Sequence, residues 1–386
     1  MKVKLNLWNC LFFLSWLSLA CTASSETNEE LSTPIQTNPD PDLQRIILPD
    51  GFRIDYYAKN VGNARSMCLS PSGTLFVGSR SKGNVYALKD TDGDFYADLR
   101  YTIRRGLRSP NGVAFKNGNL YVAEINRILV FRDIESNLAD DLPYEVIIDT
   151  YPSKSHHGWK YIAFGPDDKL YVPVGAPCNV CESADPVFNS ITRIDVNDQP
   201  KIEIIHKGIR NTVGFTWHPI TRDLWFTDNS RDWMGDDLPA CELNYAQTDG
   251  LHFGFPYCHQ GDLPDPEFGE KFPCSSFIPP VQKLGPHVAP LGLKFYTGNQ
   301  FPDRFRNQIF IAEHGSWNRS VPIGYRVTMV TLEGNKPVNY EVFADGWLQG
   351  RRAWGRPVDI ELLPDGSILV SDDHNDAIYR IWYNLL

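Results

Sequence analysis

Four segments of the chain concentrate side chains that can bind an anion or take up a proton. They contain His157 and Lys160, then Arg210 and Asn211 with Ser230 and Arg231, then His314 and Asn318, and finally Arg356. Guanidinium groups pair bidentately with planar oxyanions, and an imidazole changes its protonation state near neutral pH. If these segments meet, they predict a site for a ligand that carries several negative charges.

Each of these residues also has a simpler explanation. The adjacent His156 and His157 could lie in a solvated loop, and each arginine could pair with a neighbouring carboxylate, as Arg231 could with Asp232. Convergence of several cations on one surface would favour a ligand site over scattered ion pairs. The cations in question are Lys160, Arg210, Arg231 and Arg356.

Six stretches repeat one pattern, in which an apolar run and a turn rich in Pro, Gly, Asn or Asp precede a second strand-forming run. They are CLSPSGTLFV from Cys68, VAFKNGNLYV from Val113, IAFGPDDKLYV from Ile162, FTWHPITRDLWFT from Phe215, LKFYTGNQFPDRFRNQIFIA from Leu293 and IELLPDGSILVS from Ile360. Such a repeat is typical of a fold built from one supersecondary unit, and each unit has the turn residues of a β-hairpin. The pattern predicts an all-β, six-bladed β-propeller.

A propeller explains how residues far apart in the sequence could act together. The loops of all blades meet at one face of such a fold, and all four segments stand at the start or the end of a repeated strand. The first two blades offer Arg65 and the run Arg108-Ser109-Pro110-Asn111 as further candidates. We therefore expect one pocket near the propeller axis.

The N-terminal residues are typical of a secretory signal peptide. Residues 2–20 carry two lysines, an apolar stretch and then small residues before Cys21. The sequence Ser18-Leu19-Ala20-Cys21 resembles a bacterial lipobox and predicts a lipid on Cys21, with plain cleavage as the alternative. Residues 21–43 are polar and predict a flexible tether. We expect an exported bacterial protein, periplasmic or held at the outer membrane by its lipid, with residues 44–386 as one propeller domain.

Export determines what the remaining cysteines are expected to do. Cys178 and Cys181 fit a short disulfide and Cys258 with Cys274 fits a second, although spacing alone leaves the pairing open.

The chain has a formal net charge of −10, and loss of the two lysines of the signal peptide makes it −12. Nucleic-acid binding needs a basic surface, so we do not expect it.

One acidic loop could hold a cation of its own. Asp90, Asp92, Asp94 and Asp98 supply carboxylates at alternating positions, and calcium prefers such oxygen ligands. The loop lacks the glycine at the sixth position and the closing glutamate of an EF-hand. A structural calcium ion and a solvated acidic turn are the two interpretations.

Several long phrases resemble a known family. HHGWKYIAFGPDDKLYVPVG, GIRNTVGFTWHP, LWFTDNSRDWMGDDLP, HFGFPYCH, IFIAEHGSWNR and WGRPVDIELLPDGSILVSDDH are similar to the soluble sugar dehydrogenases that depend on pyrroloquinoline quinone (PQQ), particularly the sorbosone and pyranose dehydrogenase branch. The resemblance covers residues 44–386. It implies a six-bladed propeller, similar to soluble glucose dehydrogenase, that holds PQQ and a calcium ion at its centre.

The resemblance also implies individual roles. His157 matches the general base of the family, and Arg210 and Asn211 match residues at the quinone. Arg356 matches an arginine that binds a cofactor carboxylate. Since PQQ is a tricarboxylate, an acidic protein needs a local group of cations to hold it.

Calcium and aromatic contacts are implied as well. In glucose-oxidising relatives backbone carbonyls bind calcium at the positions of Ser230 and Arg231, and the ion would act as a Lewis acid on the quinone. Trp317 and Trp354 could stack on the cofactor or the sugar, or pack in the core.

The chain departs from its glucose-oxidising relatives at two places. They have a cofactor-binding lysine where this chain reads Glu313-His314-Gly315, and a second arginine where it has Val358. We expect His314, with Asn318 or Arg319, to replace the missing contact.

These observations predict an enzyme that oxidises a pyranose, another aldose or a sorbosone-like aldehyde. Hydride passes to PQQ while His157, beside Arg210, takes the hydroxyl proton, and the electrons continue to an external quinone or cytochrome. Two other classes stay open. A calcium-dependent propeller lactonase would surround its metal mainly with acidic side chains, and a non-catalytic propeller would only bind a glycan or a protein.

Overall fold

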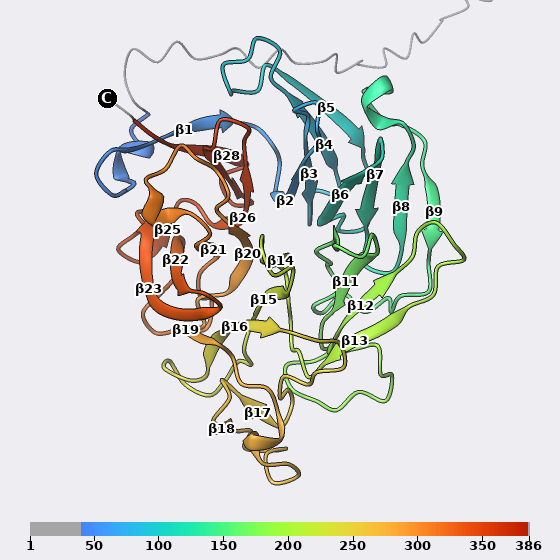
Figure 1. Cartoon of the computed structure of the whole chain (residues 1–386), viewed down its shortest axis with the longest axis vertical. Coiled ribbons are helices and arrows are strands. Elements are labelled where there is room, and N and C mark those ends of the chain that lie inside the picture. Colours follow the sequence, from blue (N-terminus) through green and yellow to red (C-terminus); the bar gives the residue numbers. More distant parts are fainter. Residues whose placement is uncertain (1–39, 385–386) are drawn as a thin grey trace, which may run out of the picture.

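The structure, a computed structural model, describes residues 40–384 and contains six four-stranded antiparallel sheets around a central axis (Figure 1). The predicted all-β, six-bladed propeller is therefore confirmed. The expected signal peptide of residues 1–20 and the lipid site at Cys21 lie outside the described residues. Within residues 40–384, no helix has the length and apolar character needed to cross a membrane.

The first three blades run outward from the axis in sequence order, with the innermost strand first. Blade 1 contains β2 (Ala64–Leu69), β3 (Leu75–Ser79), β4 (Val85–Lys89) and β5 (Leu99–Arg104). Blade 2 contains β6 (Gly112–Lys116), β7 (Asn119–Ala123), β8 (Ile128–Phe131) and β9 (Glu145–Ile148). Blade 3 contains β10 (Ala163–Phe164), β11 (Leu170–Val174), β12 (Ser190–Ile194) and β13 (Glu203–Lys207).

The other three blades complete the ring, and the last one joins the two ends of the described chain. Blade 4 contains β14 (Phe215–Trp217), β15 (Leu224–Asp228), β16 (Ala240–Ala246) and β19 (Gln282–Pro286). Blade 5 contains β20 (Pro290–Phe295), β21 (Ile309–Glu313), β22 (Arg326–Glu333) and β23 (Lys336–Ala344). Blade 6 contains β26 (Pro357–Leu362), β27 (Ile368–Asp372), β28 (Ala377–Tyr383) and, as its outer strand, β1 (Phe52–Ala58). Because β1 pairs with β28, the sheet itself closes the ring.

Short elements and two disulfides shape the loops. Two-stranded ribbons are formed by β17 (Cys258–His259) with β18 (Leu263–Pro264) and by β24 (Leu348–Gln349) with β25 (Arg352–Ala353). The 3-10 turns are η1 (Leu43–Arg45), η2 (Ile134–Asn137), η3 (Cys274–Ser276) and η4 (Asp303–Phe305). Cys178 is bonded to Cys181 and Cys258 to Cys274, which confirms both expected pairs.

Each of the six repeated phrases forms the inner hairpin of one blade. The turns between the two strands need a left-handed residue, and Gly73 and Gly366 supply it in blades 1 and 6 with φ of +87° and +89°. In blade 3 Asp168 takes this place with φ of +64°. The recurrent turn chemistry thus sets the register of the strands that reach the axis.

The hydrophobic core lies in the gaps between neighbouring blades. Phe76 of blade 1, for example, packs with Leu120 of blade 2, and Trp225 of blade 4 packs with Ile311 of blade 5. All four side chains are completely buried, and burial of each stabilises the fold by roughly 1.5–3 kcal/mol. Each blade is therefore held by both of its neighbours, which fixes the loops at the axis.

Candidate functional site

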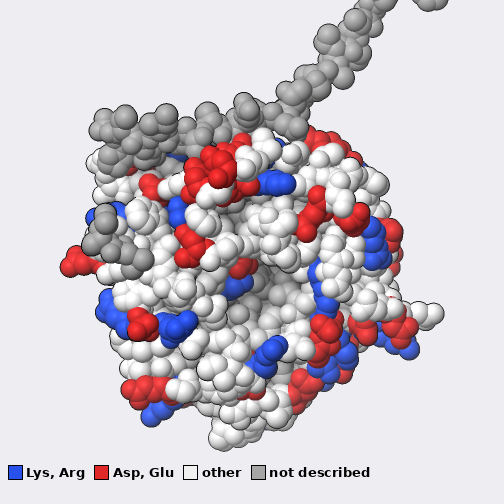
Figure 2. Space-filling model, turned by 45° about the horizontal axis from the view of Figure 1, so that its top comes forward, with Lys and Arg blue, Asp and Glu red and all other residues white. Residues whose placement is uncertain are grey.

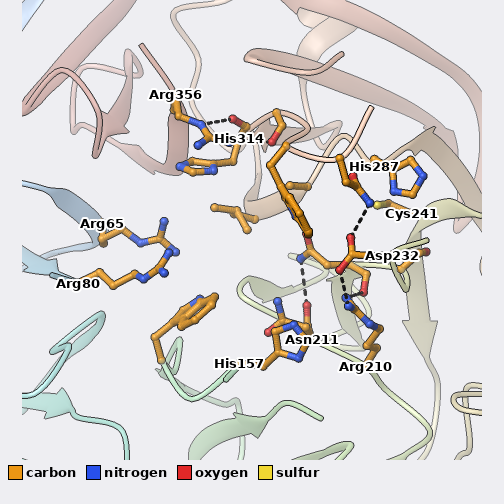
Figure 3. A pocket seen from close by; sticks show the side chains of 18 residues that line it. Arg65, Arg80, His157, Arg210, Asn211, Asp232, Cys241, His287, His314 and Arg356 are labelled. Carbon is orange, nitrogen blue, oxygen red and sulfur yellow. Dashed lines mark hydrogen bonds and ion pairs between the residues drawn. The ribbon is translucent and has the colours of Figure 1, made fainter. Parts of the chain in front are cut away.

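The polar segments predicted from the sequence meet at one face of the propeller. In every blade the innermost strand begins, and the second strand ends, at this face, because the two strands form one antiparallel hairpin. Residues at these strand ends surround a cavity of about 310 Å³ (Figure 3). Its lining residues are Arg65, Arg80, His157, Trp159, Arg210, Asn211, Asn229, Ser230, Asp232, Cys241, His287, Ala289, Leu291, His314, Gly315, Trp317, Asn318 and Arg356.

Positive charge is concentrated at this cavity although the chain as a whole is acidic. Arg65, Arg80 and Arg356 approach it from blades 1 and 6 and point toward its interior (Figure 3). The guanidinium carbon of Arg80 lies 4.1 Å from the centre of the Trp159 ring, a cation–π contact that holds the side chain in place. Figure 2 shows one face of the molecule, hollowed near its centre, with basic side chains in and beside the hollow.

Two of these three guanidinium groups form no hydrogen bond or ion pair with a carboxylate among residues 40–384. Arg356 donates from Nε to the carbonyl of His314 at 2.9 Å and from Nη2 to the carbonyl of Gly315 at 2.8 Å. Arg80 has the ring contact alone, whereas Arg65 forms an ion pair with Asp373 at 2.8 Å. Arg80 and Arg356 can therefore offer their charge to an anion in the cavity.

His157 presents an unprotonated nitrogen to the cavity. Its Nδ1 lies 2.9 Å from the carbonyl oxygen of Ala176, which can only accept, so Nδ1 carries the hydrogen and Nε2 holds the lone pair. Burial, followed by the charges of Arg210 and His156, lowers the pKa of His157 well below its usual value. The side chain is consequently a neutral base near neutral pH.

Backbone geometry brings Asn211 close to this histidine. His157 has φ of +50°, and a Cβ on Gly175 would lie 2.6 Å from the Cβ of His157 and 3.2 Å from Oδ1 of Asn211. The buried carboxylate of Asp228 accepts hydrogen bonds from the amides of Arg210 and Asn211, at 2.9 and 2.6 Å. Asp228 thereby orients both residues of the Arg-Asn pair predicted from the sequence.

Arg210 is held in place rather than free. Its Nε donates to the carbonyl of Asn179 at 2.9 Å and its Nη2 to Oδ1 of the same residue at 2.9 Å. Nη1 donates to the carbonyl of Asn229 at 3.0 Å, and Nη2 also forms an ion pair with Asp232 at 3.1 Å. Arg210 lines the cavity as a rigid positive charge beside His157, with four of its five N–H donors already in use.

A chain of hydrogen bonds links His314 to the first blades. His314 Nε2 lies 2.7 Å from Asp373, whose other oxygen pairs with Arg65 at 2.8 Å, and Nε of Arg65 donates to Asn111 at 2.7 Å. Burial lowers the pKa of His314 to about 4, so the ring is neutral near pH 7 and donates from Nε2. His314 and Arg65 therefore occupy fixed positions in the cavity wall.

Three residues expected at the cofactor do not line the cavity. Lys160 is 1% exposed and donates to a backbone carbonyl, and burial lowers its pKa to about 7. Arg231 turns away to pair with Asp265 and Glu267. Trp354 packs beside Trp347 and against the hydrophobic cluster between blades 5 and 6. The expected set of four converging cations is thus corrected: Arg210 and Arg356 reach the cavity, and Arg65 and Arg80 stand in place of Lys160 and Arg231.

The first expected metal position, at Ser230 and Arg231, offers few acidic donors. Ser230 lines the cavity and Arg231 follows it, while Asp232 is the single acidic residue among the described lining residues. A cation there would rely on carbonyl and amide oxygens, and Oδ1 of Asn318 is buried without a hydrogen-bond partner.

The acidic loop is folded around its own backbone. Carboxylate oxygens of Asp90, Asp92 and Asp98 lie within 4.8 Å of one another, and Asp94 is not in this group. Asp90 accepts hydrogen bonds from the amides of Gly93 and Phe95 at 2.7 and 2.9 Å. These bonds fit a self-contained turn, and calcium binding at the loop stays a prediction.

Three residues of the site were not expected from the sequence. Arg80 follows β3 at the position that Asn229 holds after β15, so the repeat carried a signal for it. His287 lies three residues before β20, where Ala289 and not His287 holds the place that Arg356 has before β26, so the repeat gave no signal for His287. Asn179 had no such signal, because its position depends on the loop that the Cys178–Cys181 disulfide closes.

The fold and the cavity define a six-bladed propeller with a polar, cation-lined cavity on its axis. The chain belongs to the TrAA12-like family, whose model matches residues 46–384. The expected resemblance to PQQ-dependent pyranose and aldose dehydrogenases is confirmed at the level of the family.

Individual relatives and solved structures are similar to this chain over different shares of its length. An uncharacterized protein of Borreliella burgdorferi is 34% identical over 87% of this chain and 90% of its own length. A pyrroloquinoline quinone-dependent pyranose dehydrogenase of Coprinopsis cinerea is 43% identical over 27% of this chain, a match that covers 16% of that enzyme. The iodide structure of the Trichoderma reesei carbohydrate-active enzyme of family AA12 has a TM-score of 0.77 at 19% identity, covering 88% of this chain and 97% of that one.

Proposed function

We propose that this protein is a PQQ-dependent dehydrogenase that oxidises a pyranose, another aldose or a sorbosone-like sugar aldehyde. The observation that carries the proposal is the arrangement of Arg65, Arg80 and Arg356 in a cavity that also exposes the lone pair of His157. A tricarboxylate matches such a set of cations, and a base whose proton site is unoccupied near neutral pH matches the oxidation of an alcohol.

The residues of the cavity fit the cofactor. Arg80 and Arg356 form no hydrogen bond or ion pair with a carboxylate among residues 40–384 and would hold carboxylates of PQQ. No hydrogen bond to the side-chain amide of Asn211 is found in the described part of the chain, and this amide would contact the quinone. When bound, PQQ supplies a two-electron acceptor for the hydride of the sugar, and calcium would polarise its carbonyl.

The protein itself supplies a proton acceptor and fixed charge. Nε2 of His157 accepts the hydroxyl proton of the sugar, while its Nδ1–H stays on the Ala176 carbonyl and keeps the ring oriented. The Arg210 guanidinium, anchored by Asn179 and Asp232, favours negative charge that develops beside His157. These parts are already in place, so little reorganisation is needed at the moment of reaction.

The lining residues favour this reaction over the two alternatives. A lactonase would need a cluster of acidic side chains around its calcium, whereas Asp232 stands alone among the described lining residues and is paired with Arg210. A propeller that only binds a glycan would not need Arg65, Arg80 and Arg356 together in one cavity. Calcium at the carbonyls of Ser230 and Arg231 belongs to the same proposal.

The cell biology that we propose is that of an exported lipoprotein that passes electrons to an external quinone or cytochrome. The disulfides Cys178–Cys181 and Cys258–Cys274 support export, since disulfides persist in oxidising compartments. Labelling of cells with a palmitate analogue tests the anchor, and Cys21→Ala should abolish the label. Label retained in that variant would contradict the lipid site.

Reconstitution tests the activity directly. Purified protein stripped of cofactor and metal is titrated with PQQ, with and without calcium, and uptake is followed by calorimetry and by the absorbance of the quinone. A panel of aldoses is then tested with a reducible dye. We expect one PQQ for each chain and sugar-dependent dye reduction; failure to take up PQQ would rule out the proposed function.

A further inference from the structure

An exposed pair of tryptophans stands at the mouth of the cavity. The rings of Trp233 and Trp317 meet edge to face, with centroids 5.3 Å apart and planes at 86°. Trp317 also lines the cavity. Trp233 is 69% exposed and Trp317 is 65% exposed, although tryptophan normally buries most of its surface. Two large apolar rings held in water beside a polar cavity call for an explanation other than packing.

The loops that carry the two rings are fixed to one another. Trp233 belongs to the loop after β15 and Trp317 to the loop after β21. Nδ2 of Asn318 donates to Asp232 at 2.8 Å, and the amide of Ser320 donates to Asp236 at 3.0 Å. The rings are therefore presented by a cross-linked support that keeps their relative orientation.

The backbone of Trp233 adds a second, independent observation. Its φ is +70°, in the left-handed region that bulky side chains rarely adopt. Such a conformation persists only where the surroundings impose it, and it is found preferentially at ligand-binding positions. Here it directs a large apolar ring into solvent.

We infer that Trp233 and Trp317 form a subsite for a second sugar ring, so that the enzyme accepts a disaccharide or longer saccharide whose reacting ring sits in the cavity. This inference rests on the proposed function. The C–H face of a pyranose is apolar and flat enough to stack on one ring, and the second ring at a right angle bounds it on another side. Asp237 and Arg319 in the same loops provide polar groups for its hydroxyls.

With PQQ and the reacting sugar in the cavity, a second sugar ring would lie at its mouth. PQQ has three fused rings and three carboxylates, and together with the reacting sugar it would occupy the space between the arginines and His157. A further sugar unit must leave through the mouth, where Trp317 forms part of the wall. The chemical class recognised is therefore a neutral saccharide, extended outward from the oxidised unit.

Calorimetry with and without the cofactor tests this subsite separately from catalysis. Glucose, maltose and cellobiose are titrated into wild-type protein and into Trp233→Ala, Trp233→Phe and Phe272→Ala, the last being a control with an exposed aromatic residue that does not line the cavity. We expect at least one disaccharide to bind wild-type protein about tenfold more tightly than glucose. Trp233→Ala should remove that advantage, Trp233→Phe should retain most of it, and Phe272→Ala should leave it unchanged.

Steady-state kinetics then gives the second readout. In Trp233→Ala the KM for the disaccharide should rise about tenfold while kcat and the values for glucose stay the same. Equal losses for glucose and the disaccharide, or no preference for a disaccharide in the wild type, would overturn the subsite. A defect seen only with a protein electron acceptor would overturn it as well, because it would assign the rings to protein docking. Failure to bind PQQ would count against the proposed function alone, since saccharide binding is measured without it.

Discussion

Asn179 holds the Arg210 guanidinium with two oxygens: its carbonyl accepts from Nε and its Oδ1 from Nη2, both at 2.9 Å. Asn179 lies between Cys178 and Cys181, whose disulfide closes the loop. The disulfide therefore belongs to the scaffold of the site, since it fixes the residue that orients a charge next to His157. The loop also reaches Asp232, whose amide donates to Oδ1 of Asn179 at 2.9 Å.

Removing this side chain should loosen the cavity wall. In Asn179→Ala, Nη2 of Arg210 and the amide of Asp232 lose an acceptor, which we expect to destabilise the protein by about 1–3 kcal/mol. PQQ affinity should fall about tenfold, because the anchored charge becomes mobile. Denaturation and PQQ titration measure the two effects, with the exposed Asn197→Ala as the control. Unchanged affinity in Asn179→Ala would contradict a role for the loop in the site.

His157 can be tested with a variant that keeps its hydrogen bond. Asparagine tolerates the left-handed φ of +50° and can still donate to the Ala176 carbonyl, but it has no basic nitrogen. His157→Asn should therefore bind PQQ as the wild type does, while kcat falls about 10²- to 10⁴-fold. Single-turnover reduction of the bound cofactor checks this. A variant with normal kcat would remove His157 from the role of base.

The pH profile follows from the environment of the same imidazole. Burial, with Arg210 and His156 adding to it, lowers the pKa of His157 well below its usual value, so the base form persists below pH 6.5. The acid limb of kcat/KM should then lie below about pH 6.5, where an unperturbed histidine would already be half protonated. Measurement with a pH-independent dye tests this. An acid limb at or above that pH would mean that another group, or a raised pKa, controls the reaction.

Arg80 and Lys160 make a contrasting pair of buried or partly buried cations. Arg80→Met keeps the apolar stem on Trp159 but removes the charge from the cavity, and PQQ affinity should fall about ten- to a hundredfold. Lys160→Met should leave affinity within about twofold, because Lys160 does not line the cavity. Titration calorimetry of both variants decides between the two positions. Loss of affinity in Lys160→Met alone would restore the role expected from the sequence and refute ours.

The sequence predicted the features that recur in every blade and failed where the direction of a side chain depends on one individual contact. The blade hairpins, and the cavity positions of His157, Arg210 and Arg356, follow from a repeat that places every strand end at one face. Whether a side chain at a strand end points into the cavity depends on its side-chain rotamer and on the residue with which it pairs. Arg231 is drawn away by Asp265, which lies 34 residues later in the chain, and no pattern in the sequence encodes that pairing.

Lys160 and Arg80 illustrate the same limit from opposite sides. Lys160 is close in sequence to His157, yet its side chain is buried, with 1% exposed, and its Nζ donates to the carbonyl of Gly158 outside the cavity lining. Arg80 lies in a plain Ser-Arg-Ser run after β3, and only its equivalence to Asn229 after β15 would have identified it. Comparing equivalent positions across blades is therefore more informative than proximity to a motif.

Glu242, directly after the lining residue Cys241, gives a prediction for stability. Burial, followed by the charge of Asp228, raises the pKa of Glu242 to about 8. The folded-state pKa of Glu242 lies above its unfolded value. The stability that its protonated form contributes is therefore fully present below about pH 4.5 and is lost as the pH rises through about 8. Near pH 7 Glu242 is protonated in the folded state but ionised in the unfolded state, and taking up this proton costs the folded state about 3 kcal/mol.

Glu242→Gln should therefore stabilise the protein at high pH. Glutamine can still accept from the Gln260 amide, and its own amide can donate to Oδ1 of Asn244, a buried atom that has no partner, once the Asn244 amide turns over. We expect the free energy of unfolding to rise near pH 8 and to change little near pH 5, as measured by urea denaturation at both values. The exposed Glu341→Gln is the control and should have no such dependence. An equal change at the two pH values would show that packing, and not protonation of Glu242, sets the effect.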